Sequence, residues 1–145
     1  MGTKISLRGD TLVCHPAFRG FSSQRFCSLP ARANLITDPG FESCTEDLGD
    51  APGWTTTNNP PCFNFGGHSG SWGALFAGSE STVSQTITTI IGDNYDFSFW
   101  LRGSNSSDSF AASFGSDEVL DLVDPGSFAY TLEDFTVTGR DKHGD

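Results

Sequence analysis

Residues 82–103 show the clearest alternation of apolar and polar side chains in the chain. Four large apolar residues occupy every second position of the later half: Tyr95, Phe97, Phe99 and Leu101. The intervening positions carry a different set: Asp96, Ser98, Trp100 and Arg102. A period of two is typical of a strand with one buried face. Residues 82–88 alternate similarly and are rich in β-branched residues, and Gly92-Asp93-Asn94 suits a tight turn. The pattern predicts two strands joined by that turn.

Short apolar runs separated by turn residues continue on both sides of this pair. Further strands are predicted for six segments: 34–37, 62–65, 72–76, 110–114, 119–123 and 128–138. In the last segment the apolar positions change phase after Leu132, which predicts a bulge near Glu133-Asp134. About eight short strands with turn signals about every 8–12 residues predict an all-β, antiparallel sandwich or jelly roll.

Composition agrees with this fold class and narrows the range of partners. The 145 residues suffice for one domain with a core, and 13 Phe and 17 Gly accompany a single Met. The formal net charge of −10 argues against binding a nucleic acid or an anionic membrane, since both need a basic contact face. Because no apolar run reaches about 18 residues, the sequence predicts no membrane span.

The basic residues are concentrated at the start of the chain. Residues 1–32 hold five of the eight Lys and Arg and one acid, whereas the remainder holds three bases and 17 acids. Ala31-Arg32-Ala33 fits the small-residue rule for leader cleavage, although His15 and Pro16 interrupt the apolar run. We expect residues 1–33 to be an atypical leader or a loosely packed segment, residues 34–139 the sandwich, and residues 140–145 a tail. The alternative is that residues 1–33 add a strand to the domain.

Catalytic motifs are missing from the sequence. Gly67-His68-Ser69-Gly70-Ser71 fails the Gly-x-Ser-x-Gly pattern of a nucleophile elbow because Ser71 stands where the last Gly is needed, so it is interpreted as a turn. No paired-carboxylate or phosphate-cradling motif is present either. The sequence therefore predicts that the protein is not an enzyme, with a catalytic domain of unrecognised type as the remaining rival.

Six segments, taken together in order and spacing, resemble a known family. They are NLITDPGFES, GW, HSGSWGALF, STVSQTI, GDNYDFSFWLRG and YTLEDFTVTG, and they span residues 34–139. This set resembles the CenC-type carbohydrate-binding modules, jelly rolls of the galactose-binding-like fold, as found in exported bacterial proteins with a PEP-CTERM sorting signal. The resemblance implies a secreted, non-catalytic module that binds a polysaccharide or other glycan. A structural or adhesive extracellular module that binds no sugar is the alternative.

The chain departs from this family after residue 139. Relatives continue with closing strands, and the exported ones with a sorting signal, whereas here residues 139–145 read GRDKHGD. Unless residues 1–33 or a partner fill the gap, an open sheet edge would favour self-association. A jelly roll truncated at its C-terminus, present as a non-functional copy, is therefore a further alternative.

The resemblance also implies a disulfide and a calcium site. It places the loop between Cys44 and Cys62 outside the cytoplasm, where a bridge would stabilise the fold by about 3 kcal/mol. Cys14 and Cys27 could pair likewise. In the family a structural calcium is bound by a Glu whose position matches Glu42, and Asp38 stands beside it in the sequence. The site would be incomplete without the closing strand. In the alternative interpretation these two carboxylates only solvate a turn.

Trp100 is the candidate platform for a sugar ring. It shares the polar side of its strand with Arg102, Ser98 and Asp96, and an aromatic ring beside hydrogen-bonding groups suits a pyranose. The alternative is that Trp100 belongs to the core of a second layer, because both faces of a central strand can be covered.

Overall fold

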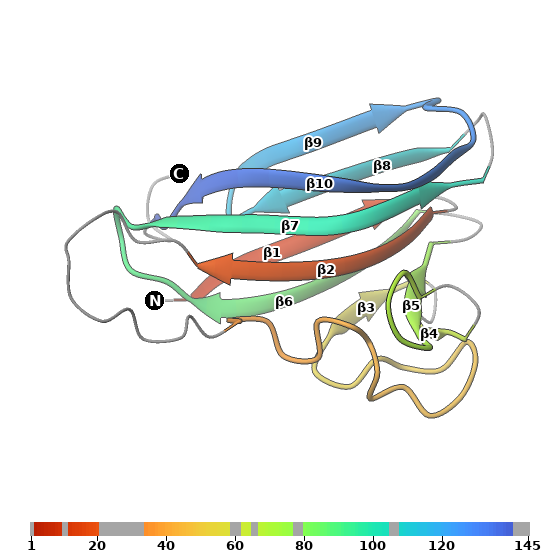
Figure 1. Ribbon diagram of the computed structural model, residues 1–145. Helices are drawn as coiled ribbons and strands as arrows, with labels where there is room; N and C mark the ends of the chain where they lie inside the picture. The colour runs from red at the N-terminus through yellow and green to blue at the C-terminus, as the bar shows by residue number, and fades with distance from the viewer. Residues whose placement is uncertain are drawn as a thin grey trace.

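The computed structural model describes the backbone of residues 2–9 and 12–20, and the residues of 34–58, 62–64, 67–76, 80–104 and 108–140 in full. These residues form ten strands and no helix, so none of them lies in a helix able to cross a membrane. The strands build two five-stranded sheets, in which every pair is antiparallel (Figure 1). The predicted all-β antiparallel fold is confirmed.

Most neighbouring strands within each sheet are far apart in the sequence, β8–β9 and β4–β5 being the exceptions. Sheet A has the order β3 (Thr55–Thr57), β6 (Ser81–Thr88), β1 (Gly2–Gly9), β8 (Ser109–Phe114) and β9 (Asp117–Val123). Sheet B has the order β10 (Phe128–Thr138), β7 (Asn94–Gly103), β2 (Leu12–Gly20), β5 (Gly73–Leu75) and β4 (Cys62–Phe63). The chain passes between the sheets repeatedly, so each sheet is complete only when distant segments meet.

Among the described residues, phenylalanine rings from both sheets meet in the core. Phe97 and Phe99 of β7 are fully buried, as the alternation predicts. Across the interface the ring of Phe99 lies 5.6 Å from that of Phe110, and the ring of Phe97 lies 6.2 Å from that of Phe114, both on β8. Burial of such large rings removes apolar surface from water at about 25 cal/mol per Å², which makes this layer a major stabilising feature.

The N-terminal segment supplies the central strand of each sheet. β1 is hydrogen-bonded between β6 and β8, and β2 between β7 and β5, so each is the third of five strands in its sheet (Figure 1). The expectation that residues 1–32 pack only loosely is therefore wrong for residues 2–9 and 12–20, and the alternative of added strands applies. The physical reason is that the flanking strands have no other partner on that side. Residues 21–33, with Cys27 and the expected cleavage site, lie outside the described residues, and their role as a leader stays a prediction.

Residues 34–37 do not form the predicted strand, because the side chain of Gln85 bonds to their backbone. The amide N–H of Thr37 donates to Gln85 Oε1 at 2.7 Å, and Gln85 Nε2 donates to the carbonyl oxygens of Thr37 at 3.0 Å and Gly53 at 2.8 Å. Gln85 lies on β6, so one amide side chain fixes two coil segments to sheet A. On the side of β6 away from β1 the partner strand is β3, whose three threonines were not predicted as a strand from the sequence.

The bulge in β10 is displaced from its predicted place near Glu133-Asp134. The pairing of β10 with β7 shifts between Phe128 and Thr131. Phe128 packs against the core, and its ring occupies the space where a Cβ on Gly103 would stand. From Thr131 onward the register is regular, with Leu132 opposite Trp100 and Phe135 opposite Phe97. The bulge thus turns Leu132 to the outer face of sheet B and keeps Phe135 inside.

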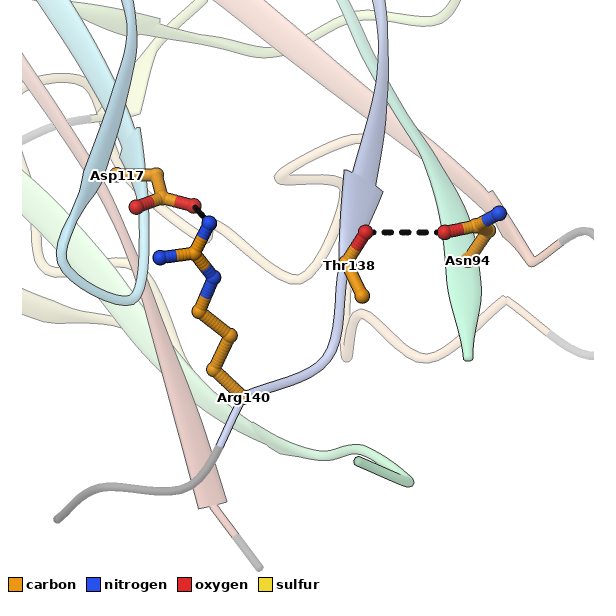
Figure 2. A network of polar contacts seen from close by, with 4 residues as sticks. All are labelled: Asn94, Asp117, Thr138 and Arg140. Carbon is orange, nitrogen blue, oxygen red and sulfur yellow. Dashed lines mark hydrogen bonds and ion pairs between the residues drawn. The ribbon is translucent and has the colours of Figure 1, made fainter. Parts of the chain in front are cut away.

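Polar contacts at one end of the sandwich hold the last strand in register. Thr138 Oγ1 donates to Asn94 Oδ1 at 3.0 Å, which joins β10 to the start of β7 (Figure 2). Arg140 Nη2 lies 3.1 Å from Asp117 Oδ2 and links the residues after β10 to the start of β9 in sheet A. Both partners are substantially exposed, so this ion pair contributes little to stability. Residues 141–145 of the expected tail lie outside the described residues.

Candidate functional site

Three rings and a guanidinium gather on the outer face of sheet B. We call them the aromatic cluster: Trp100 and Arg102 of β7, Tyr130 of β10, and His68 from the loop before β5. The alternation of β7 places Trp100 and Arg102 on this outer face. Phe99 and Leu101 are buried, so the residues that alternate with them must face outward. Trp100 and Arg102 are half-buried, so the alternative that Trp100 lies within a core does not hold.

The rings of the aromatic cluster are in direct contact. The imidazole of His68 lies parallel to the indole of Trp100, with centroids 3.9 Å apart and an interplanar angle of 9°. The ring of Tyr130 meets the imidazole edge-on at 5.2 Å and 75°. The guanidinium carbon of Arg102 lies 5.2 Å from the centre of the Tyr130 ring, within the range of a cation–π contact. The cluster therefore combines stacking surface with hydrogen-bond donors at one place.

Glu42 holds the loop that carries His68. Its Oε1 accepts hydrogen bonds from the backbone amides of Ser71 at 3.0 Å and Trp72 at 3.1 Å. Gly70 has a φ of 92°, and a Cβ there would collide with the Glu42 carboxylate, so only glycine fits this approach. The backbone of residues 70–72 is thereby fixed to a residue almost 30 positions earlier in the chain.

The other predicted ligand-binding residues lie further along the same face. Ser98 and Asp96 precede Trp100 by two and four residues on β7 and lie opposite Asp134 and Thr136 of β10. With a rise of about 3.3 Å per residue, Asp96 lies about 13 Å from Trp100 along the strand. The structure thus brings Trp100 and Arg102 into one cluster and places Ser98 and Asp96 beside it on a common surface.

Two members of the aromatic cluster were missed by reasoning from the sequence. His68 was interpreted as part of a turn, and Tyr130 as one of the apolar positions of the last strand. For Tyr130 the available signal was the change of phase of the apolar positions in residues 128–138. A bulge earlier in the strand than predicted explains this change and places Tyr130 near Arg102. For His68 the sequence carries no such signal, because its contact with Trp100 joins two distant segments.

The two expected calcium ligands each accept hydrogen bonds from backbone amides. The Asp38 carboxylate accepts from the amide of Ser43 at 3.2 and 3.3 Å, within its own turn, while Glu42 caps residues 71 and 72. Calcium prefers six to eight oxygen ligands. Among the described residues no three acidic, histidine or cysteine side chains are grouped to hold a metal ion. The calcium site stays a prediction of the resemblance.

Cys44 and Cys62 form the predicted disulfide, with a Cα–Cα distance of 6.0 Å. Both are buried beside the loop that they enclose. Within this loop the ring of Trp54 stacks on Phe41 at 5.1 Å, and its Nε1 donates to the carbonyl oxygen of Asp38 at 3.1 Å. The bridge therefore closes a long loop that contains β3 and packs Trp54 into the core.

We expect a double variant, Cys44→Ser with Cys62→Ser, to lose about 3 kcal/mol of unfolding free energy, because the 18-residue separation is no longer constrained in the unfolded chain. Thermal unfolding without reductant measures the loss as a fall of the midpoint by roughly 10 °C. Dithiothreitol should lower the midpoint of the natural chain toward that of the variant. Equal midpoints in the absence of reductant would contradict a stabilising bridge.

Comparison of the chain with protein-family models, with curated proteins and with solved structures found no match. The glycan-binding role implied by the resemblance to carbohydrate-binding modules is accordingly a proposal, and its support comes from the geometry of the aromatic cluster.

Proposed function

We propose that the protein is a non-catalytic, secreted module that binds a glycan through the aromatic cluster. The observation that carries the proposal is the placement of half-buried Trp100 on the outer face of a packed sheet. The Arg102 guanidinium and the Tyr130 ring lie in the same cluster. The apolar face of a pyranose stacks on an indole, and guanidinium and phenol groups donate hydrogen bonds to its hydroxyls.

The shape of this surface suits an extended ligand. Four outward positions on β7, from Asp96 to Arg102, form a line about 20 Å long beside the outer residues of β10. Sheet positions hold side chains more rigidly than loops do, which lowers the entropy lost on binding. The net charge of −10 favours a neutral polysaccharide over an anionic one.

The disulfide supports the secreted location, since such bonds form and persist mainly in oxidising compartments. The jelly-roll topology and a structural calcium belong to the same proposal and rest on the resemblance. The alternating passage of the chain between two antiparallel sheets supports the topology without specifying it.

Trp100→Ala is expected to abolish retention on immobilised polysaccharide, because the stacking surface is lost. Elution volumes on cellulose, chitin and xylan columns measure it, and the thermal midpoint should change by only a few degrees, since an outer-face residue contributes little to the core. Ile91→Ala is the matched control, because Ile91 is 57% exposed and lies in the turn before β7. It should be retained like the natural chain.

Retention of the Trp100→Ala variant at the natural elution volume would show that the ligand does not stack on Trp100. If the natural chain passes every column unretarded, the alternative of a structural or adhesive extracellular module is favoured.

A further inference from the structure

One face of the Trp100 indole is already occupied in the free protein. The imidazole of His68 covers it at 3.9 Å and nearly parallel, which is the separation of rings in van der Waals contact. No sugar ring fits between two planes at this distance. A ligand that stacks on this face must therefore take the place of the imidazole.

The imidazole can leave without breaking the loop. His68 is itself exposed, so its side chain can rotate toward solvent. The hydrogen bonds from Ser71 and Trp72 to Glu42 involve only backbone amides after His68, and these remain when the side chain turns. The backbone of the loop is thus held at residues 71 and 72, while the His68 side chain is exposed.

We propose that the His68 imidazole competes intramolecularly with the ligand: it covers the sugar-stacking face of Trp100 until a ligand ring displaces it. This proposal rests on the function proposed above. The seat of the imidazole, bordered by the Tyr130 ring, then marks the position of one ligand ring. That ring needs a flat apolar face, as in a pyranose whose hydroxyls are equatorial. Only molecules in which His68 has left Trp100 can bind in this way. The apparent affinity is therefore the intrinsic affinity multiplied by the fraction of such molecules.

His68→Ala is expected to bind more tightly than the natural chain, by about two- to tenfold, the range to which the stacking energy of one ring pair converts. Isothermal titration with soluble β-glucan and xylan oligosaccharides measures the change. Ser69→Ala is the matched control, because Ser69 is exposed in the same loop, and it should bind like the natural chain. Weaker binding by His68→Ala, with Ser69→Ala unchanged, would overturn the proposal and make His68 part of the platform.

A second measurement needs no ligand and keeps the two proposals separate. Acrylamide quenching of tryptophan fluorescence is measured in the natural chain, which has three tryptophans, and in Trp100→Phe. The difference between the two measurements gives the solvent accessibility of Trp100. The same difference in a His68→Ala background should show greater accessibility. If accessibility rises but no oligosaccharide binds, His68 covers Trp100 and the glycan function fails. If accessibility does not rise, the covering role of His68 is overturned, whatever the binding results.

Discussion

A chain lacking residues 2–20 is expected to lose cooperative unfolding altogether. β1 pairs with β6 along its whole length and with β8 over residues 5–9, while β2 pairs with β7 along its whole length. Their loss divides each sheet at its centre and leaves unpaired N–H and C=O groups on the strands that flank the gap. No single substitution would remove as many interactions.

Near-ultraviolet circular dichroism during heating measures this effect, because it reports on the fixed environments of the aromatic core rings. The shortened chain should show no sigmoidal transition. A synthetic peptide of residues 2–20, added in excess, should restore part of the signal by filling both gaps. A transition at the natural midpoint in the shortened chain without peptide would show that these strands are not required by the sandwich.

Phe99→Ala should be the most destabilising single substitution, with a loss of about 3–5 kcal/mol. Phe99 is fully buried, and its ring contacts those of Phe97 at 5.5 Å, Phe110 at 5.6 Å and Phe135 at 6.1 Å. Truncation to Ala leaves a cavity at the contact of the two sheets that the surrounding rings can fill only partly.

Urea unfolding of Phe99→Ala gives the change in free energy directly from the midpoint and slope. Phe99→Leu is the matched control and should lose less, since it keeps most of the buried apolar volume. Ile90→Ala, at a residue that is 65% exposed, should change stability by less than about 0.5 kcal/mol. A small loss in Phe99→Ala would mean that the ring layer is not a major source of stability.

The sequence by itself determined the features that depend on local pattern. The alternation in residues 95–102 predicted which side chains of β7 are buried and that Trp100 faces outward, because the side-chain period of a strand is two whatever its partners are. The strands from β6 to β10 were predicted within a few residues for the same reason. The pairing of Cys44 with Cys62 followed from the resemblance, which placed their loop outside the cytoplasm.

Only the tertiary structure decided the features that depend on which segments meet. The pattern of residues 2–20 is interrupted by charge and by Pro16, yet these residues supply the central strand of both sheets, because their neighbours need a partner there. The bulge in β10 depends on the packing of Phe128 beside Gly103, which no spacing in the sequence reveals. The contact of His68 with Trp100 joins residues 32 positions apart and depends on the hydrogen bonds of Glu42 to the loop. Local pattern fixes the face on which a side chain lies, but the partner on that face is decided by packing between distant segments.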